Sequence, residues 1–334
     1  MRKIMISISC LLLSGVAMTS CAVTGCENMS DEKHVPLAST VINAEGQFAG
    51  ISNSTVIDVE FTQGDKPSVE LICPQDYEKH VIIGVVGNTL EMKLSDKLDN
   101  AARNEVNRQL RHAKLYVTSS ALDKVLVNGS SEFNVNGDLR ADRLDVTLNG
   151  SGDVNFNGVH SNSHVTVTLN GSGDVLFRRE AKAGNISLAL NGSGDVNCAI
   201  LTAEKVKAGV AGSGDIDIDE VAALELSLSV AGSGDLEAHR IMANNVQAVL
   251  TGSGDMKLSG TCDNAELNLT NSGNISAKNL EAIKVKSSVI GSGSIECHAQ
   301  KELSASVTGS GDISYRGNPS IISSVKNGQL TKIR

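Results

Sequence analysis

Aspartate shows the most regular chemical pattern in this sequence. It recurs at one position of six successive repeats of about 20 residues, as the last residue of a Gly-Ser-Gly-Asp turn: Asp153, Asp174, Asp195, Asp215, Asp235 and Asp255. If the repeats stack about 4.8 Å apart, adjacent carboxylates repel by roughly 1 kcal/mol in water and need a compensating partner. Hard cations such as Ca²⁺ bind carboxylate oxygens, but the spacing is not that of the nonapeptide calcium repeat. We therefore expect each Asp to accept hydrogen bonds from the Gly and Ser amides of its own turn.

Serine and histidine are the other candidates for chemistry. A nucleophile elbow requires G-x-S-x-G on a strand-to-helix turn with a base nearby, and no histidine recurs beside the GSGD serines. His160 and His164 could form a metal pair, but no third ligand is evident, and we expect them to be surface histidines. The sequence has no HExxH, no CxxC and no phosphate loop followed by a helix. We predict no catalytic residue, no metal site and no cofactor.

The turns that carry these residues predict the architecture. Full or degenerate copies of the turn begin 18 to 21 residues apart, at Gly129, Gly150, Gly171, Gly192, Gly212, Gly232, Gly252, Asn271, Gly291 and Gly309. Apolar residues alternate with period two on both sides of each turn, which indicates short, half-buried strands. One such coil cannot bury its apolar side alone, so coils must stack in parallel. The predicted fold is all-β: a parallel β-helix, or β-solenoid, of about 20-residue coils with GSGD turns. A β-propeller blade would need about twice this period.

Equivalent residues of the coils should lie in rows along such a solenoid. Four asparagines precede successive turns and predict an amide ladder: Asn128, Asn149, Asn170 and Asn191. We assign residues 128–317 to regular coils, 46–127 to irregular N-terminal coils with a short helix at 100–111, and 318–334 to a C-terminal cap. Cys198 and Cys297 share a coil position five coils apart, about 24 Å along the axis, so they should not form a disulfide.

The N-terminus predicts export. Arg2 and Lys3 precede an apolar run that is too short to span a bilayer, as in a secretory signal peptide at residues 1–20. Cys21 follows this run directly and is the predicted lipidation site, with residues 21–45 as a tether. Cys26, which follows Val23-Thr24-Gly25, is an alternative site, and soluble secretion is a third possibility. Since no later segment is apolar enough to cross a membrane, we expect the lipid to be the only membrane anchor.

Composition excludes one class of partner. The formal net charge is −9, and the chain has no Trp, 3 Tyr and 5 Phe. Nucleic-acid binding depends on Lys and Arg that neutralise phosphates and on aromatic rings that stack with bases. We therefore expect no nucleic-acid partner.

Three motifs in order resemble one known family. They are Phe48-Ala49-Gly50-Ile51, the repeated GSGD coils, and the closing Tyr315-Arg316-Gly317-Asn318-Pro319. The sequence is similar to the auto-transporter adhesin head GIN domain family of exported bacterial β-solenoid proteins over residues 46–334, although the GIN tripeptide itself is absent. The resemblance implies an adhesin-like protein. Together with the signal and Cys21, it leads us to expect a non-enzymatic protein of the cell envelope, lipid-anchored at the outer membrane on its surface or periplasmic face, with an unknown protein or glycan as ligand.

Two other functions remain open. An envelope sensor or assembly partner is one. A carbohydrate-active β-helix enzyme is the other, and such an enzyme needs paired acid and base groups in a cleft built from long loops. The turns here are uniformly short, which favours the adhesin-like interpretation.

Overall fold

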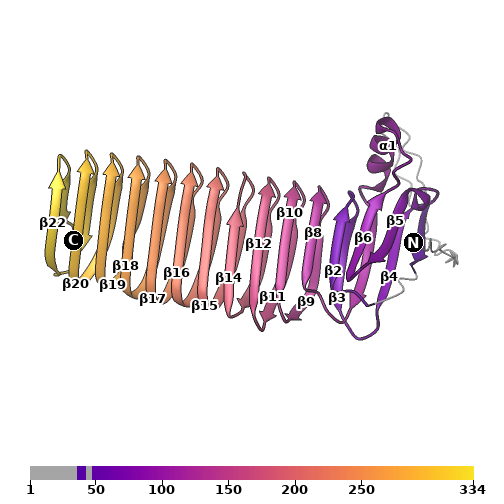
Figure 1. The fold of residues 1–334 in the computed structure, drawn as a ribbon, viewed down its shortest axis with the longest axis horizontal. Helices are drawn as coiled ribbons and strands as arrows, with labels where there is room; N and C mark the ends of the chain where they lie inside the picture. The colour runs from indigo at the N-terminus through magenta and orange to yellow at the C-terminus, as the bar shows by residue number, and fades with distance from the viewer. Residues whose placement is uncertain (1–35, 43–46) are drawn as a thin grey trace, which may run out of the picture.

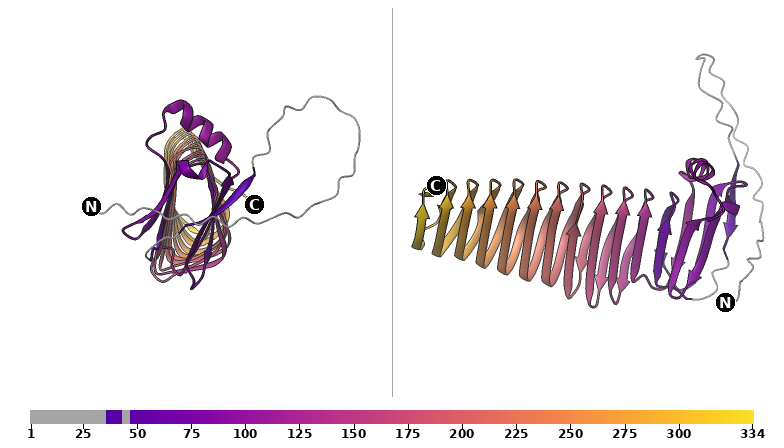
Figure 2. Two further views of the ribbon diagram at one scale, coloured as in Figure 1. Left: turned by 90° about the vertical axis from the view of Figure 1, so that its right-hand side faces the viewer. Right: turned by 45° about the horizontal axis from the view of Figure 1, so that its top comes forward.

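The protein is a rod of stacked β-coils in the computed structural model, which describes residues 36–42 and 47–334 (Figures 1 and 2). The N-terminal strands lie at one end of the rod, and the yellow C-terminal strands lie at the other. Viewed along the rod, the coils superimpose as a flattened loop (Figure 2, left). The predicted β-solenoid is therefore confirmed.

Two parallel sheets form the walls of the regular coils. Sheet I contains the strands that lead into each turn, and sheet II contains the strands that follow it. The first strands of sheet I are β8 (Lys124–Gly129), β10 (Leu144–Gly150), β12 (His164–Gly171) and β14 (Asn185–Leu190). Those of sheet II are β9 (Phe133–Ala141), β11 (Val154–Ser161) and β13 (Val175–Lys182).

Later coils are each one continuous strand that bends from sheet II into sheet I. These strands are β15 (Val196–Gly212), β16 (Ile216–Gly232), β17 (Leu236–Gly252), β18 (Asp255–Asn271), β19 (Asn274–Gly291) and β20 (Ser294–Gly309). The register follows the sequence repeat, because the first Gly of one turn pairs with the first Gly of the next, as Gly212 does with Gly232.

The N-terminal end mixes parallel and antiparallel pairing. Strands β2 (Gly50–Ser54) and β6 (Thr89–Leu94) extend sheet I in parallel, and β5 (Val81–Val86) then pairs antiparallel with β6. Strands β3 (Asp58–Gln63) and β7 (Lys114–Ser119) extend sheet II in parallel. Strands β4 (Ser68–Pro74) and β1 (Leu37–Val41) complete that sheet with antiparallel pairs.

One α-helix interrupts this N-terminal region, as the sequence predicted. Helix α1 (Asn100–Leu110) begins after Asp99, whose Oδ1 accepts a hydrogen bond from the Ala102 amide at 2.8 Å. Such a side-chain cap satisfies one of the free amides of the first turn. A short 3₁₀ turn, η1 (Glu78–His80), precedes β5.

At the C-terminus three short strands continue the stack. Strand β21 (Asp312–Arg316) pairs in parallel with β20, as does β22 (Ser320–Lys326), and β23 (Gln329–Lys332) pairs in parallel with β21. Ile321 and Val325 keep the alternation of the earlier coils and align with the buried Leu303 and Val307. Residues 318–334 therefore lie over the last regular coil and follow its alternation.

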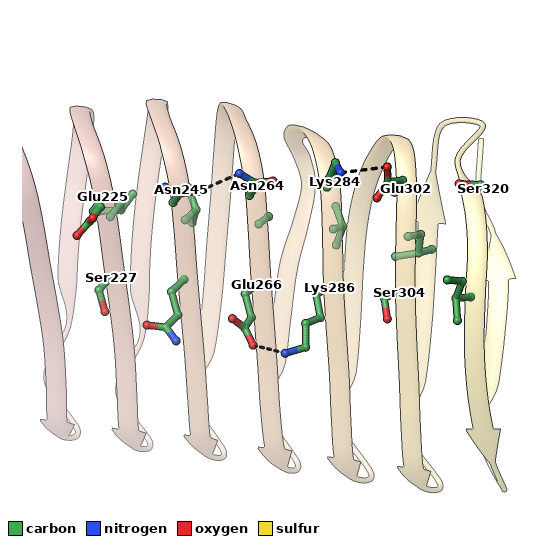
Figure 3. Close-up of a pocket in the computed structure, with 17 residues that line it drawn as sticks. Glu225, Ser227, Asn245, Asn264, Glu266, Lys284, Lys286, Glu302, Ser304 and Ser320 are labelled. Carbon is green, nitrogen blue, oxygen red and sulfur yellow. Dashed lines mark hydrogen bonds and ion pairs between the residues drawn. The ribbon is translucent and has the colours of Figure 1, made fainter.

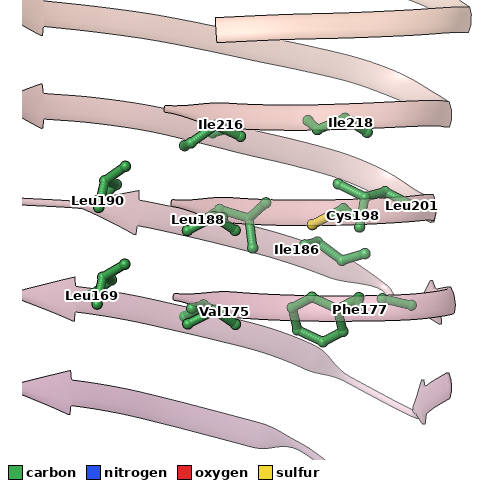
Figure 4. Packing of buried hydrophobic residues seen from close by; sticks show 14 of the residues in the cluster. Leu169, Val175, Phe177, Ile186, Leu188, Leu190, Cys198, Leu201, Ile216 and Ile218 are labelled. Carbon is green, nitrogen blue, oxygen red and sulfur yellow. The ribbon is translucent and has the colours of Figure 1, made fainter. Parts of the chain in front are cut away.

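The core is a column of apolar side chains between the two sheets (Figure 4). Leu148, Leu169 and Leu190 align in successive coils of sheet I, and all three are buried. Phe156 and Phe177 stack in sheet II with ring centroids 5.0 Å apart. All five phenylalanines lie in the core. The rod therefore buries its largest rings and presents few aromatic surfaces for a ligand.

The cysteines of the coils belong to this core. Within the described ranges Cys73, Cys198, Cys262 and Cys297 are buried and free of disulfides. This confirms that Cys198 and Cys297 are not paired. Burial raises the pKa of the Cys297 thiol to about 12.

Candidate functional site

The six ladder aspartates bond along the axis of the rod. The Oδ1 atom of each accepts a hydrogen bond from the backbone N–H that begins the next coil, from Asp174 to Asp153 at 3.0 Å and from Asp235 to Asp215 at 2.8 Å. The same bond links the other neighbours, and at the end of the row the Asn274 amide donates to Asp255 at 3.1 Å. The prediction that each Asp caps its own turn is therefore wrong, because the side chain reaches the following coil.

Backbone carbonyls satisfy the turn amides that we had assigned to the aspartates. The Ser213 and Gly214 amides both donate to the carbonyl of Gly192 in the preceding coil, at 2.9 and 3.1 Å. The turns also stack so closely that a Cβ on Gly173 would lie 1.7 Å from the Gly152 carbonyl oxygen. Glycine is required there by this close approach.

The predicted amide ladder is present. Asn149 donates to Asn128 at 2.8 Å, Asn170 to Asn149 at 2.9 Å, and Asn191 to Asn170 at 3.0 Å. The two inner amides, Asn149 and Asn170, thus use the Nδ2 group toward one neighbour and the Oδ1 atom toward the other. These bonds connect the coils on the outer surface of sheet I.

The two candidate histidines have different surroundings. His164 begins β12, and its Nε2 atom lies 3.3 Å from Asp145 Oδ1. His160 lies near the end of β11, in register between Arg140 and Lys182. In residues 36–42 and 47–334 no three His, Cys, Asp or Glu side chains converge as potential ligands of a metal ion.

A groove on sheet I was not predicted from the sequence. It has a volume of about 700 Å³ and crosses the coils near the C-terminal end of the rod (Figure 3). Its polar lining residues stand in two rows: Glu225, Asn245, Asn264, Lys284, Glu302 and Ser320, and beside them Ser227, Gln247, Glu266, Lys286 and Ser304. The sequence signal was this recurrence of polar residues at two outward positions of successive coils.

Hydrogen bonds and ion pairs hold the groove side chains in place. Asn264 Nδ2 donates to Asn245 Oδ1 at 2.9 Å in the middle of the first row. Lys284 lies 3.1 Å from Glu302, and in the second row Lys286 lies 2.8 Å from Glu266. The groove therefore offers amide, ammonium and carboxylate groups in fixed positions, which suits a ligand rich in hydrogen-bonding groups.

The surroundings of Glu266 differ from those of a catalytic acid. Its hydrogen bond to Lys286 lowers the pKa of Glu266, which keeps this carboxylate ionised. A catalytic acid needs its pKa raised toward the working pH. Glu266 is thus suited to bind a cationic or hydroxyl group of a ligand.

The predicted lipidation site Cys21 and its alternative Cys26 lie outside the described residues. Among residues 36–42 and 47–334, no helix is long and apolar enough to cross a membrane.

Comparison with known proteins places the sequence beside one family. The profile of the family described as "Putative auto-transporter adhesin, head GIN domain" matches residues 47–225 and 216–319. No curated protein of known function matches the sequence.

Several crystal structures are similar over most of the chain. A putative lipid binding protein from Parabacteroides distasonis is 22% identical, with a TM-score of 0.37, and the match covers 89% of this chain and 97% of that one. A putative adhesin from the same organism is 20% identical with a TM-score of 0.44, covering 90% and 98%. A putative adhesin from Bacteroides fragilis is 21% identical with a TM-score of 0.29, covering 89% and 97%.

Proposed function

The chain belongs to the auto-transporter adhesin head GIN domain family, and we propose that it is an exported, lipid-anchored envelope protein that binds a partner without catalysis. An adhesin-like family is consistent with a place at the cell surface or in the envelope. In this proposal the solenoid is a spacer with binding groups along its walls, and the lipid is attached at Cys21.

The groove on sheet I is the observation that carries the binding proposal. It is built by β16 to β20 and β22, at the opposite end of the rod from the N-terminal strands β4 and β5 (Figure 1). A rod anchored at its N-terminal end would hold this groove farthest from the membrane. Contact with a partner beyond the envelope surface would then occur first at the groove.

The lining of the groove indicates the class of partner. Amides such as Asn245 and Gln247 both donate and accept hydrogen bonds, and Lys284 and Glu302 add charges of both signs. No aromatic side chain lines the groove to stack on a sugar ring. We infer a protein or glycan ligand that is recognised by hydrogen bonds and paired charges.

Binding by the groove can be tested with two matched double variants. Glu266→Gln with Lys286→Gln removes one of the ion pairs in the groove, and Glu237→Gln with Lys257→Gln removes a similar exposed pair on sheet II. Exposed pairs contribute little stability, so both variants should fold. On an array of glycans and peptides, the groove variant should lose the signals that the wild type and the control variant give. Equal signals from both variants would contradict a role for the groove.

Lipid anchoring has its own test. Cells that express the full chain should incorporate radiolabelled palmitate into it, and Cys21→Ala should abolish the label. Labelling that survives Cys21→Ala and disappears in Cys26→Ala would move the anchor to Cys26. An unlabelled wild-type protein in the culture medium would show soluble secretion.

A further inference from the structure

A row of basic side chains on sheet II has no role in the proposal above. Arg140, His160 and Lys182 lie near the ends of β9, β11 and β13, one in each of three successive coils. The register pairs His160 with Arg140 on one side and with Lys182 on the other. We call these three residues the basic row.

Elsewhere on the rod, neighbouring coils place opposite charges next to each other. Lys205 pairs with Glu225, Lys257 with Glu237, and Lys286 with Glu266 in this way, each one coil apart. Within residues 36–42 and 47–334, no side chain of the basic row takes part in an ion pair. The usual compensation of charge between coils is thus missing at this place, in a chain whose formal net charge is −9.

The basic row lines a basin of about 690 Å³. Other parts of its lining come from three neighbouring segments: Ser120, Ala121, Asp123, Ala141, Asp142, Ser161 and Asn162. Asp123 and Asp142 bring negative charge to the basin, and Asn162 Nδ2 donates to Asp142 Oδ1 at 2.8 Å. This bond occupies one oxygen of Asp142 but leaves its charge in place, so any anionic ligand must lie along the basic row and away from the two carboxylates.

Side-chain bonds to the backbone hold the basin in shape. The Arg140 amide donates to Gln63 Oε1 at 2.9 Å, and Gln63 Nε2 donates to the Arg140 carbonyl at 2.8 Å. Ser161 Oγ donates to the carbonyls of Asp142 and His164, both at 3.0 Å. The first and middle members of the row thus project from braced backbone.

We propose that the basic row binds an anionic polysaccharide, whose sulfate or carboxylate groups lie along the rod axis. Successive coils are about 4.8 Å apart, so a linear chain of anionic groups can meet the row at intervals of one or two coils. The open basin leaves room for sugar rings beside the charges. This inference rests on the proposed surface location, and it adds a ligand class and a second contact site on the opposite sheet.

The test uses the full-length protein in detergent and fluorescein-labelled dextran sulfate, with fluorescence anisotropy as the readout. Wild-type protein should bind, and added salt should weaken the binding because screening reduces Coulomb attraction. At contact distance in water one charge pair is worth about fivefold in affinity. The double variant Arg140→Gln with Lys182→Gln should therefore bind about 30-fold more weakly.

Two further variants keep the result specific to the basin. Lys257→Gln with Lys278→Gln removes the same charge from sheet II outside the basin and should bind within about twofold of the wild type. Asp123→Asn with Asp142→Asn removes the acids of the basin and should bind more tightly. Thermal melting of each variant checks that it is folded.

Three results would overturn the inference. The first is equal binding of dextran sulfate by the basin variant and the wild type. The second is equal binding of neutral dextran. The third is binding of polyglutamate or of anionic phospholipid vesicles as tight as that of dextran sulfate, which would show a polyanion site without preference for a glycan. None of these results bears on the groove, which the Glu266 and Lys286 variants test separately.

Discussion

Two substitutions of Asp215 separate the charge of the aspartate ladder from its hydrogen bonds. Asp215→Asn and Asp215→Ala both remove the charge between Asp195 and Asp235. Only Asp215→Ala also removes the oxygen that accepts the Asp235 amide at 2.8 Å. The difference in stability between the two variants therefore measures this one hydrogen bond.

The structure gives the expected size of each effect. Carboxylates about 4.8 Å apart repel by about 0.9 kcal/mol in water, and salt reduces this value. Asp215→Asn removes the repulsion with both neighbouring carboxylates. It also replaces a charged acceptor of the Asp235 amide with a neutral one, which weakens that hydrogen bond at a cost of about 1 kcal/mol. We expect the free energy of unfolding of Asp215→Asn to stay within about 1 kcal/mol of the wild type, and that of Asp215→Ala to lie about 1 kcal/mol below Asp215→Asn.

Urea unfolding and amide hydrogen exchange provide the assay. In Asp215→Ala the Asp235 amide should exchange faster, whereas the Ser213 amide, which donates to Gly192, should not change. Ca²⁺ bound only by the folded protein would raise its melting temperature. Because the Asp oxygens here accept backbone amides, we expect neither millimolar Ca²⁺ nor EDTA to change the melting temperature of the wild type. The reasoning is refuted if Asp215→Asn and Asp215→Ala are equally stable and the exchange of Asp235 is unchanged. A loss of stability in Asp215→Asn that appears only with Ca²⁺ would instead show a metal ladder.

Three further predictions concern the core and the turns. Ser287→Ala should stabilise the protein by about 1 kcal/mol in urea unfolding, because Ser287 Oγ is buried without a hydrogen-bond partner. A destabilised variant would show that this hydroxyl makes a hydrogen bond in the folded protein. Gly173→Ala should lower the free energy of unfolding by about 2 kcal/mol or more, because its Cβ would meet the Gly152 carbonyl. Gly84→Ala, with open space around it, should change this free energy little. Similar effects at both sites would refute the stacking of the turns. The Cys297 thiol, whose pKa burial raises to about 12, should react with a thiol reagent at about pH 8 only after unfolding, and reaction in the native protein would contradict its burial.

The sequence repeat predicted which residues align but not every bond between them. The ladder from Asn128 to Asn191 followed from the repeat alone, because identical amides at one coil position can bond to each other. The partner of Asp215 did not, because the period does not reveal whether a carboxylate turns back to its own amides or reaches the next coil. That choice depends on the Gly192 carbonyl, which already occupies the turn amides.

Strand direction and surface shape were also beyond the sequence pattern. Val69 and Leu71 in β4 alternate like the strands of the regular coils, but β4 runs antiparallel to β7. Alternation reports which face of a strand is buried and is the same for both directions. The groove on sheet I was missed because single coils contribute only two or three residues to it, and its depth arises from the way several coils are placed together.

Adhesion of cells that display the full chain tests the central claim most directly, namely that the anchored rod binds a partner through its groove. Cells with the wild-type chain and cells with Glu237→Gln and Lys257→Gln should adhere equally to a surface coated with the ligand identified on the array. Cells with Glu266→Gln and Lys286→Gln should fail to adhere at equal surface expression. Full adhesion by the groove variant would contradict the claim.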